Sequence, residues 1–346
     1  MRDECTIDGW PAGSIERLGA CPLCAATARS CLHEGLTDRL FGTPGEWRLH
    51  ACGQCGIAYL DPRPNAKEIH RAYARYFTHA DDPLGDPQQP GTTWIQSLQL
   101  AVLRAYLRRH FGRVVARPSD SLALVMRLFP DARSELDGAM RGVARPHPGD
   151  TVLDIGCGSG RFLAWARFAG WKGMGTEVDP DAATRARAKG FEVHEGPLEE
   201  LLASGRKFEA ITIGHVIEHV YDPRAVLRTA RQLLQPGGHF WIETPNIAAH
   251  GHQCFGARWR GLEPPRHLQI FTPEVLRALL EEAGFDQVRF APWRGEWQWM
   301  ANASREGTRA PGLARALFRG SDPDERVGRD DPRKREFITL TATVTA

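Results

Sequence analysis

The sequence of 346 residues predicts an α/β protein in which a doubly wound, mainly parallel sheet follows a small cysteine-bearing module. Beyond residue 151, short apolar segments alternate with helical patterns at the interval of successive βαβ units. Ahead of them, two Cys-x-x-Cys pairs begin at Cys21 and Cys52, further apart than in the commonest ribbons. A chain of this length, with 42% hydrophobic residues, can build one large domain and a small module.

The first predicted strand of the sheet ends in a glycine-rich turn that suits a nucleotide-like ligand. Asp154 lies in this strand, and Gly156, Gly158 and Gly160 follow before a helical pattern begins at Arg161. Such a turn presents backbone N–H groups and a helix N-terminus to the ligand. The third glycine comes one residue too early for a dinucleotide fingerprint, so the spacing favours a ligand without pyrophosphate, such as S-adenosylmethionine.

The second predicted strand, over residues 173–180, ends in acidic residues. Glu177 follows Gly156 at the distance that one helix and one strand require, and its carboxylate can accept both ribose hydroxyls of the cofactor. Val178 is the neighbouring residue expected in the same cofactor site. A surface helix is predicted over residues 181–189, and further strands over residues 191–194, 208–213 and 238–244.

Together these segments resemble the core of the class I S-adenosylmethionine-dependent methyltransferases over residues 149–292. The resemblance implies a seven-stranded Rossmann-like sheet with an antiparallel last strand, in which residues 285–291 form strand six and 337–344 form strand seven. It also implies that Leu198 lies beside the adenine, although Pro197 stands where these enzymes often place an acid. The residues thereby assigned to the cofactor are Asp154, Gly156, Gly158, Gly160, Glu177, Val178, Leu198 and Gly214.

The two cysteine pairs predict a metal site in the N-terminal module. Thiolates of Cys21 and Cys24 in one tight turn, and of Cys52 and Cys55 in another, can complete a tetrahedral four-thiolate zinc site. Strands are expected immediately before and after the second pair, and a longer hairpin between the two pairs. A redox dithiol, a rubredoxin-like iron site and unbound cysteines are the competing interpretations.

A four-cysteine ribbon ahead of a class I core is similar to bacterial methyltransferases of sugar, cell-envelope and secondary metabolism. The expected organisation is a zinc-ribbon-like module over residues 1–64, a linker and helical region over residues 65–148, and the methyltransferase core over residues 149–346. Insertions on the acceptor side of the core are expected at about residues 245–272 and 293–336.

In the helical region, the pattern over residues 94–111 predicts a helix that is apolar on more than one face, which is typical of buried helices. Two interpretations stay open: this helix covers the active site, or it packs against a second copy of the chain to form a homodimer. Residues 81–91 are a predicted linker, and shorter helices are expected around residues 122–129 and 132–140. Residues 321–336 carry many charges of both signs and predict a mobile loop.

The charges of the chain are nearly balanced, with 44 basic and 42 acidic residues and a net charge of +2. No basic block provides the attraction that nucleic-acid binding requires. The first residues lack the apolar core of a targeting signal, and no apolar run has the length of a membrane span. Together with cysteine pairs suited to metal, these features predict a cytoplasmic protein.

The segment after the fourth predicted strand carries the candidate catalytic residues. A neutral imidazole can remove a proton from an attacking hydroxyl, and His215 is the predicted base, with His219 and His267 in support. The segment is similar to that of ubiquinone-pathway O-methyltransferases and small-RNA 2′-O-methyltransferases, which bind a metal through Glu-x-x-Glu-His. His215 replaces the first Glu of that motif, while Glu218 and His219 match it. A metal cluster of these residues with His267 therefore stays open, as does a structural hydrogen-bonding role.

The acceptor is expected to bind between residues 244 and 273 and near the connection of strands six and seven. Tryptophans in these regions can stack on a sugar or an aromatic ring, and arginines can bind a phosphate or carboxylate. These residues are Trp259, Trp293, Trp297, Trp299, Arg258, Arg260 and Arg266.

The sequence therefore predicts methyl transfer from S-adenosylmethionine to an oxygen of a small molecule or a glycan, in secondary metabolism or cell-envelope biosynthesis. The expected cofactors are S-adenosylmethionine and a structural zinc ion. One alternative is an RNA methyltransferase whose zinc ribbon contacts the nucleic acid. A second alternative is a non-enzymatic binding protein that retains the fold.

Overall fold

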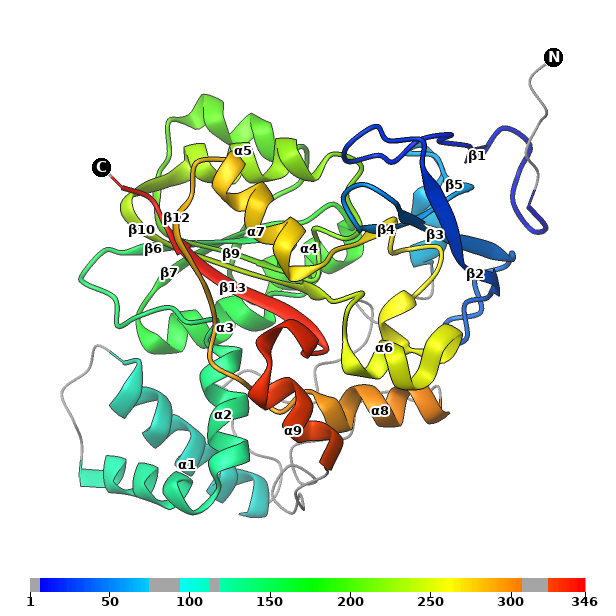
Figure 1. Ribbon diagram of the computed structural model, residues 1–346. Coiled ribbons are helices and arrows are strands. Elements are labelled where there is room, and N and C mark those ends of the chain that lie inside the picture. Colours follow the sequence, from blue (N-terminus) through cyan, green and yellow to red (C-terminus); the bar gives the residue numbers. More distant parts are fainter. Residues whose placement is uncertain (1–6, 75–93, 113–117, 307–322, 346) are drawn as a thin grey trace.

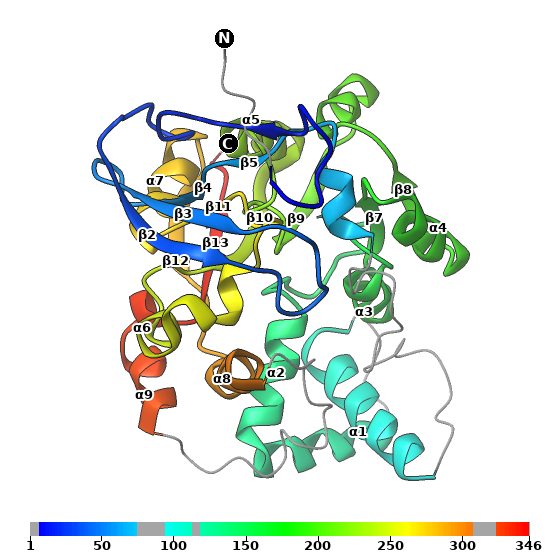
Figure 2. The ribbon, with the colours of Figure 1, turned by 90° about the vertical axis from the view of Figure 1, so that its right-hand side faces the viewer.

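The computed structural model describes residues 7–74, 94–112, 118–306 and 323–345 (Figure 1). Its central part is a seven-stranded sheet with helices on both faces. A smaller, cysteine-bearing sheet lies beside the carboxyl ends of the central strands, and Figure 2 looks onto this smaller sheet. A group of helices that precedes the central sheet in sequence packs below it in both views.

The central sheet has the strand order β12-β13-β10-β9-β6-β7-β8. Strand β13 is antiparallel to both of its neighbours, and the other pairs are parallel. This confirms the predicted seven-stranded sheet with an antiparallel last strand. The parallel strands are mostly buried because helices cover both faces. The strands are β6 (Thr151–Ile155), β7 (Lys172–Thr176), β8 (Glu192–His194), β9 (Phe208–Gly214), β10 (Leu234–Pro245), β12 (Asp286–Phe290) and β13 (Phe337–Thr343).

Two helices pack on each face of the central sheet. Helices α3 and α4 share one apolar cluster with β6, whereas α5 and α7 share another cluster with β9, β10 and β13. Asp179 and Asp222 precede helices that begin with proline, and their carboxylates accept N–H groups of the first turns of α4 and α5. Such residues strongly favour a helix start. The four helices are α3 (Arg161–Ala169), α4 (Pro180–Ala188), α5 (Pro223–Leu233) and α7 (Pro273–Glu282).

The helical region occupies the segments in which helices are predicted. It comprises α1 (Trp94–His110), the 3₁₀ segment η3 (Pro118–Leu128) and α2 (Pro130–Ala139). Leu103 and Leu107 of α1 are buried, but Leu98 is 54% exposed, so the prediction of a helix buried on all its apolar faces is wrong at that position. The predicted linker over residues 81–91 lies outside the described residues. Among the helices that the structure describes, none has both the length and the apolar character needed to cross a membrane.

The smaller sheet carries both cysteine pairs and has the order β11-β4-β3-β2. Strands β2 and β3 form the long hairpin between the two pairs, and β3 and β4 are the strands predicted before and after the second pair. Strand β11 comes from the core and was not predicted. The strands are β2 (Arg29–Leu36), β3 (Trp47–Cys52), β4 (Ala58–Leu60) and β11 (Gln269–Ile270); β1 (Ile15–Glu16) pairs with β5 (Arg63–Pro64), and the 3₁₀ segment η1 spans Ile69–Tyr73.

The prediction of a mobile loop over residues 321–336 is wrong for most of residues 323–336, the part of this segment that the structure describes. Helix α9 spans Pro323–Asp330, and a 3₁₀ turn follows at Pro332–Lys334. The mixed charges that suggested disorder suit this helix, because two acids lie in its first turn and Arg329 lies in its last, complementing the helix dipole. Helix α9 contacts two further helices on the acceptor side, α6 (His250–Phe255) and α8 (Trp297–Glu306).

Candidate active site and metal centres

The candidate cofactor residues lie at the carboxyl ends of neighbouring parallel strands. Asp154 lies near the end of β6, Glu177 directly follows β7, and Gly214 ends β9. Because parallel strands end at one edge of the sheet, these residues share that edge, which is where open α/β sheets bind their ligands. Leu198 begins the 3₁₀ segment η4 (Leu198–Ser204) and is buried.

The three glycines of the turn after β6 all have positive φ, but they serve different needs. A Cβ atom at Gly156 would lie 2.3 Å from Val216 Cγ2, and one at Gly160 would lie 2.9 Å from Phe191, so packing excludes side chains there. A Cβ atom at Gly158 would meet no atom within 4 Å. The backbone at Gly158 is therefore open to a ligand.

The carboxylate of Glu177 closes this turn from the side of β7. Its Oε2 accepts the Gly158 N–H at 2.7 Å, and its Oε1 accepts the N–H groups of Val178 at 2.8 Å and Asp179 at 2.9 Å. Burial raises the pKa of Glu177, and these hydrogen bonds oppose that effect. A carboxylate offers about four acceptor sites, so contact with both ribose hydroxyls requires the release of one backbone bond. Next to it, the apolar side chain of Val178 is 84% exposed.

Arg141 supplies a cation at the same edge and was missed by sequence reasoning. Its guanidinium pairs with the fully buried Asp154, which also accepts the hydroxyl of Thr212 at 2.8 Å. Burial raises the pKa of Asp154, and the charge of Arg141 opposes that rise. Asp154 Oδ2 makes no hydrogen bond within the described part of the chain. The guanidinium also lies 4.5 Å from the centre of the Phe162 ring and 3.0 Å from the place of a Cβ atom at Gly214.

His215 directly follows β9 and has a positive φ of 55°. Its side chain is 42% exposed, with Nε2 3.3 Å from Glu243 Oε1 and Nδ1 3.6 Å from Glu218 Oε1. Glu243, near the end of β10, is a second residue that sequence reasoning missed. Its other oxygen accepts the Thr339 hydroxyl at 2.7 Å and pairs with Arg294. A carboxylate placed in this way orients the imidazole ring.

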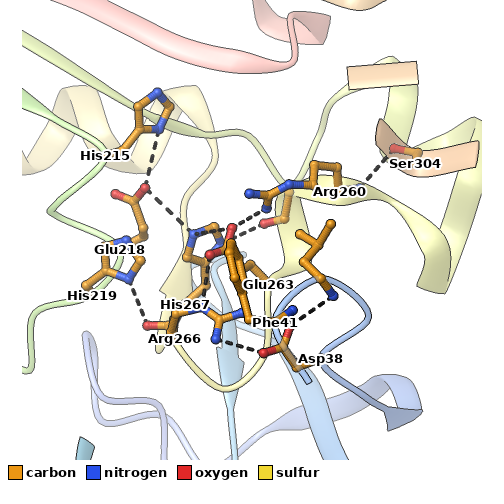
Figure 3. Close-up of polar contacts among 12 residues, drawn as sticks. Asp38, Phe41, His215, Glu218, His219, Arg260, Glu263, Arg266, His267 and Ser304 are labelled. Atoms are coloured by element: carbon orange, nitrogen blue, oxygen red, sulfur yellow. Dashed lines mark hydrogen bonds and ion pairs between the residues drawn. The ribbon is translucent and has the colours of Figure 1, made fainter. Parts of the chain in front are cut away.

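Glu218 is the fully buried centre of a polar cluster (Figure 3). Its Oε2 accepts the Thr244 hydroxyl at 2.9 Å, whereas its Oε1 makes no hydrogen bond within the described residues and lies 4.0 Å from His267 Nε2. Burial by itself would raise the pKa of Glu218, but the nearby imidazoles of His215, His219 and His267 lower it to about 2. Glu218 is therefore a buried carboxylate ion at neutral pH.

His219 directly follows Glu218 in the chain, whereas His267 comes from the segment that precedes β11. His219 Nδ1 lies 2.9 Å from the Arg266 carbonyl, and His267 Nδ1 lies 2.7 Å from the Gly261 carbonyl. A carbonyl only accepts, so Nδ1 of each ring carries a hydrogen and Nε2 is the ring nitrogen left for another partner. Burial lowers the pKa of His267 to about 4, although Glu263 opposes this effect, so the ring is neutral near pH 7.

One ligand atom each from Glu218, His219 and His267 lie within 4.8 Å of one another. A carboxylate and two imidazoles are a common donor set for divalent metal ions. Metal-binding histidines commonly donate their second ring N–H to a backbone carbonyl, as both histidines do here. This donor set fits a divalent metal ion.

The four cysteines of the two pairs also converge. Cys21 Sγ lies 3.7 Å from Cys55 Sγ, and Cys24 Sγ lies 3.5 Å from Cys52 Sγ, and none of these cysteines forms a disulfide. Tetrahedral bonds of about 2.3 Å from sulfur to zinc place the sulfur atoms about 3.8 Å apart. The geometry of the cluster therefore fits a four-thiolate zinc site.

Several predicted acceptor-binding residues are instead parts of the packed structure. Trp259 is buried and donates its indole N–H to Glu336 Oε2 at 2.7 Å. Arg266 is fully buried in ion pairs, and Arg260 pairs with Glu263. The acceptor-binding interpretation is wrong for the buried Trp259 and Arg266, whereas for Arg260, whose side chain is 12% exposed, it stays a prediction. Trp297 is also buried. Acceptor binding stays a prediction for three residues that are at least partly exposed: Trp293, Trp299 and Arg258.

Comparison with known proteins identifies the family. The model of a family described as a methyltransferase domain matches residues 113–289, just over half of the chain. The ubiquinone biosynthesis O-methyltransferase of Caulobacter vibrioides is 36% identical over 189 residues, which are 48% of this chain and 72% of that protein. The protein of the same name from Azorhizobium caulinodans is 29% identical over 225 residues, covering 60% of this chain and 79% of the relative.

Methyltransferases are among the solved structures that align with this chain. An S-adenosylmethionine-dependent methyltransferase from Archaeoglobus fulgidus aligns over 64% of this chain and 98% of its own, with a TM-score of 0.42 and 21% identity. Phosphoethanolamine N-methyltransferase 2 from Haemonchus contortus, in complex with S-adenosylmethionine, aligns over 84% of this chain and 63% of its own, with a TM-score of 0.43 and 13% identity. By its match to the family and its sheet topology, this chain belongs to the methyltransferase domain family and is an S-adenosylmethionine-dependent methyltransferase.

Proposed function

We propose that this enzyme transfers the methyl group to a hydroxyl oxygen of a small molecule or a glycan. The cluster of Glu218, His219 and His267 is the observation that carries the proposal, because such a donor set activates hydroxyl groups. Two of its relatives are named ubiquinone biosynthesis O-methyltransferases, which supports oxygen as the acceptor atom and makes phenols the first acceptors to test.

The edge of the central sheet fits S-adenosylmethionine. The open backbone at Gly158 can approach the ligand, and the exposed Val178 can cover one face of the adenine. Glu177 is the proposed acceptor of the ribose hydroxyls, and Arg141 and Asp154 are proposed to offer charges of both signs to the carboxylate and ammonium of the ligand. When bound, S-adenosylmethionine supplies an electrophilic methyl group. Gly156, Gly160, Leu198 and Gly214 complete the proposed cofactor site by shaping its walls.

The hydroxyl group is activated by the residues beyond the end of β9. Glu218, His219 and His267 would hold a divalent ion, which lowers the pKa of a hydroxyl bound to it. His215 lies between this cluster and solvent, and Glu243 orients its ring. His215 is therefore the proposed acceptor of the hydroxyl proton. In-line placement of acceptor and methyl group contributes as well.

The cysteine cluster is proposed to hold one structural zinc ion. The four sulfur atoms lie within 4.8 Å of one another, and two of their separations, 3.7 Å and 3.5 Å, are close to that expected around tetrahedral zinc. Backbone N–H groups of Gln54 and Cys55 face Cys52 Sγ at 3.4 Å and 3.5 Å. Such N–H groups stabilise thiolate ligands. A role for this module in nucleic-acid binding gains no support from the net charge of +2.

A transfer assay with labelled S-adenosylmethionine tests the proposed acceptor. The acceptors to compare are a catechol, a sugar with a blocked reducing end, an aromatic amine of similar shape, and a structured RNA. We expect label on the catechol or on the sugar, and loss of transfer after chelation with recovery on addition of a divalent ion. Transfer to the amine or the RNA, with none to either hydroxyl compound, would contradict O-methylation of a small molecule.

A further inference from the structure

The segment that carries His267 is held by the cysteine-bearing sheet as well as by the methyltransferase core. Strand β11 directly follows this segment and pairs with β4. The backbone of Leu268 joins the two parts: its N–H donates to the Glu218 carbonyl at 2.9 Å, and its own carbonyl accepts the Leu60 N–H at 3.0 Å. A single residue thus connects β4 to the turn that carries Glu218.

Arg266 is a second connection between the two parts. Its fully buried guanidinium donates to Asp38 Oδ2 at 2.8 Å and to Thr43 Oγ1 at 3.0 Å, and both partners lie in the hairpin of β2 and β3. The Arg266 carbonyl accepts the Nδ1–H of His219 (Figure 3). The side chain of Arg266 is therefore bonded to the N-terminal module, while its backbone orients a residue of the candidate metal cluster.

Asp38 is itself held rigidly in place. Its carboxylate accepts three backbone N–H groups, from Leu40 at 3.2 Å, Phe41 at 3.1 Å and Thr43 at 3.0 Å. Burial would raise the pKa of Asp38, but the hydrogen bond and the charge of Arg266 lower it, so the group is ionised. Arg266 also pairs with Glu263 at 2.9 Å, so removing the Asp38 charge takes away one of the two carboxylates that balance this buried guanidinium and disturbs its position.

We infer that the zinc-ribbon-like module is the frame that positions the cluster of Glu218, His219 and His267, with Asp38 and Arg266 as positioning residues. This inference rests on the proposed function, because it gives the module a role in assembling that site. It predicts that the module controls metal binding and turnover at the cluster, while cofactor binding at the other strands of the sheet is independent of it. Loss of groups that orient metal ligands typically weakens metal binding by about 10- to 100-fold.

The test compares Asp38→Asn with Glu68→Gln in the zinc-loaded chain. Glu68 pairs with Arg71 at 2.6 Å just after the module in sequence, and both side chains are partly exposed, so Glu68→Gln is the control for loss of a surface ion pair. The measurements are Mn²⁺ affinity by electron paramagnetic resonance, kcat and KM with the hydroxyl acceptor, and the Kd of S-adenosylhomocysteine. For Asp38→Asn we expect Mn²⁺ affinity and kcat to fall by about tenfold or more and the Kd to stay within about twofold. Glu68→Gln should change none of these values.

A milder variant guards against misfolding of Asp38→Asn. Thr43→Val removes the hydroxyl that accepts from Arg266 and leaves the Thr43 N–H on Asp38, so it should lower Mn²⁺ affinity and kcat in the same direction by a smaller factor. Both variants should retain about one zinc per chain. Variants that fold and bind zinc, yet match Glu68→Gln in Mn²⁺ affinity and kcat, would overturn the inference.

Failure of the proposed function is distinguishable from failure of the inference. If the wild-type chain methylates a hydroxyl without binding Mn²⁺, the metal assignment fails and the kcat of the variants decides the inference. If it binds Mn²⁺ but methylates no hydroxyl, the proposal of a hydroxyl acceptor is wrong. The Mn²⁺ affinities of the variants then test the inference. If it does neither, the site that the module would position does not exist, and the inference is wrong as well.

Discussion

Gly158 is the residue at which the glycine turn is open to the cofactor, and it yields the first prediction. Gly158→Val places a branched side chain at a residue whose φ is 53°. The side chain would fill the space in which the cofactor is proposed to approach the protein backbone. We expect S-adenosylhomocysteine binding in calorimetry to weaken beyond detection. Gly205→Val is the control, because Gly205 has a φ of 67° and equally open surroundings but precedes β9 at the opposite edge. Both variants should lose about 1–3 kcal/mol of stability, and equal cofactor affinity in the two would exclude Gly158 from the site.

His215 gives the second prediction at the scale of single residues. If its imidazole receives the hydroxyl proton, His215→Ala should lower kcat by about 10²- to 10⁴-fold and leave the Kd of S-adenosylhomocysteine near normal. Glu243→Gln should lower kcat less, since it removes only the group beside Nε2. Unchanged turnover in His215→Ala, together with insensitivity of the wild type to chelators, would leave His215 with a packing role against Phe337.

Residues whose role depends on local pattern could be predicted, whereas residues defined by distant contacts could not. The glycines of the turn and Glu177 stand at spacings fixed by one strand, one turn and one helix. Arg141 and Glu243 have no such spacing, since Arg141 meets Asp154 and Glu243 meets His215 only after the sheet has formed. For the same reason the burial of Arg266 and Trp259 was not visible in the sequence.

At the scale of elements, five strands of the central sheet follow from the alternation of apolar segments and helices, whereas β12 and β13 were expected from the resemblance to class I methyltransferases. Strand β11 has only two residues and is a strand because β4 lies beside it, so no pattern of its own could predict it. Helix α9, in contrast, does have a pattern of its own, which was interpreted as disorder. Its charges and prolines are typical of disorder in composition, yet their order along the segment matches the two ends of a helix.

The cysteine-bearing sheet gives the third prediction, which concerns metal removal. Elemental measurement should find about one zinc per chain, and Cys52→Ser should lose it. Because Cys52 ends β3 and the second pair leads into β4, loss of zinc should unfold this sheet at lower denaturant than the central sheet. Cys31→Ser is the matched control, since Cys31 is an exposed thiol on β2 outside the cluster. A metal-free chain with normal unfolding of both sheets would contradict a structural zinc site.

At the scale of the whole molecule, a pair of histidines joins the N-terminal module to the core. His33 Nε2 of β2 lies 2.8 Å from His252 Nε2 of α6. Burial lowers the pKa of both rings, and the neighbouring His252 lowers that of His33 further. Both imidazoles are therefore neutral in the folded chain at neutral pH, and an acidic solution must place positive charges into this contact.

The fourth prediction follows from these lowered pKa values. Since the folded-state values lie below the unfolded-state value of about 6.5, the unfolded chain binds more protons at acidic pH. The stability that the two neutral imidazoles contribute should therefore be complete above about pH 6.5. The free energy of unfolding should decrease as the pH falls below this value and through the folded-state pKa values. Urea unfolding at about pH 7.5 and about pH 5 measures this decrease. His252→Asn keeps an N–H donor near the Ile247 carbonyl and should reduce the decrease, whereas His70→Asn, at an exposed position, should leave it unchanged. If the free energy of unfolding decreases equally in His252→Asn and the wild type, protonation of the His33–His252 contact does not cause the loss of stability in acid.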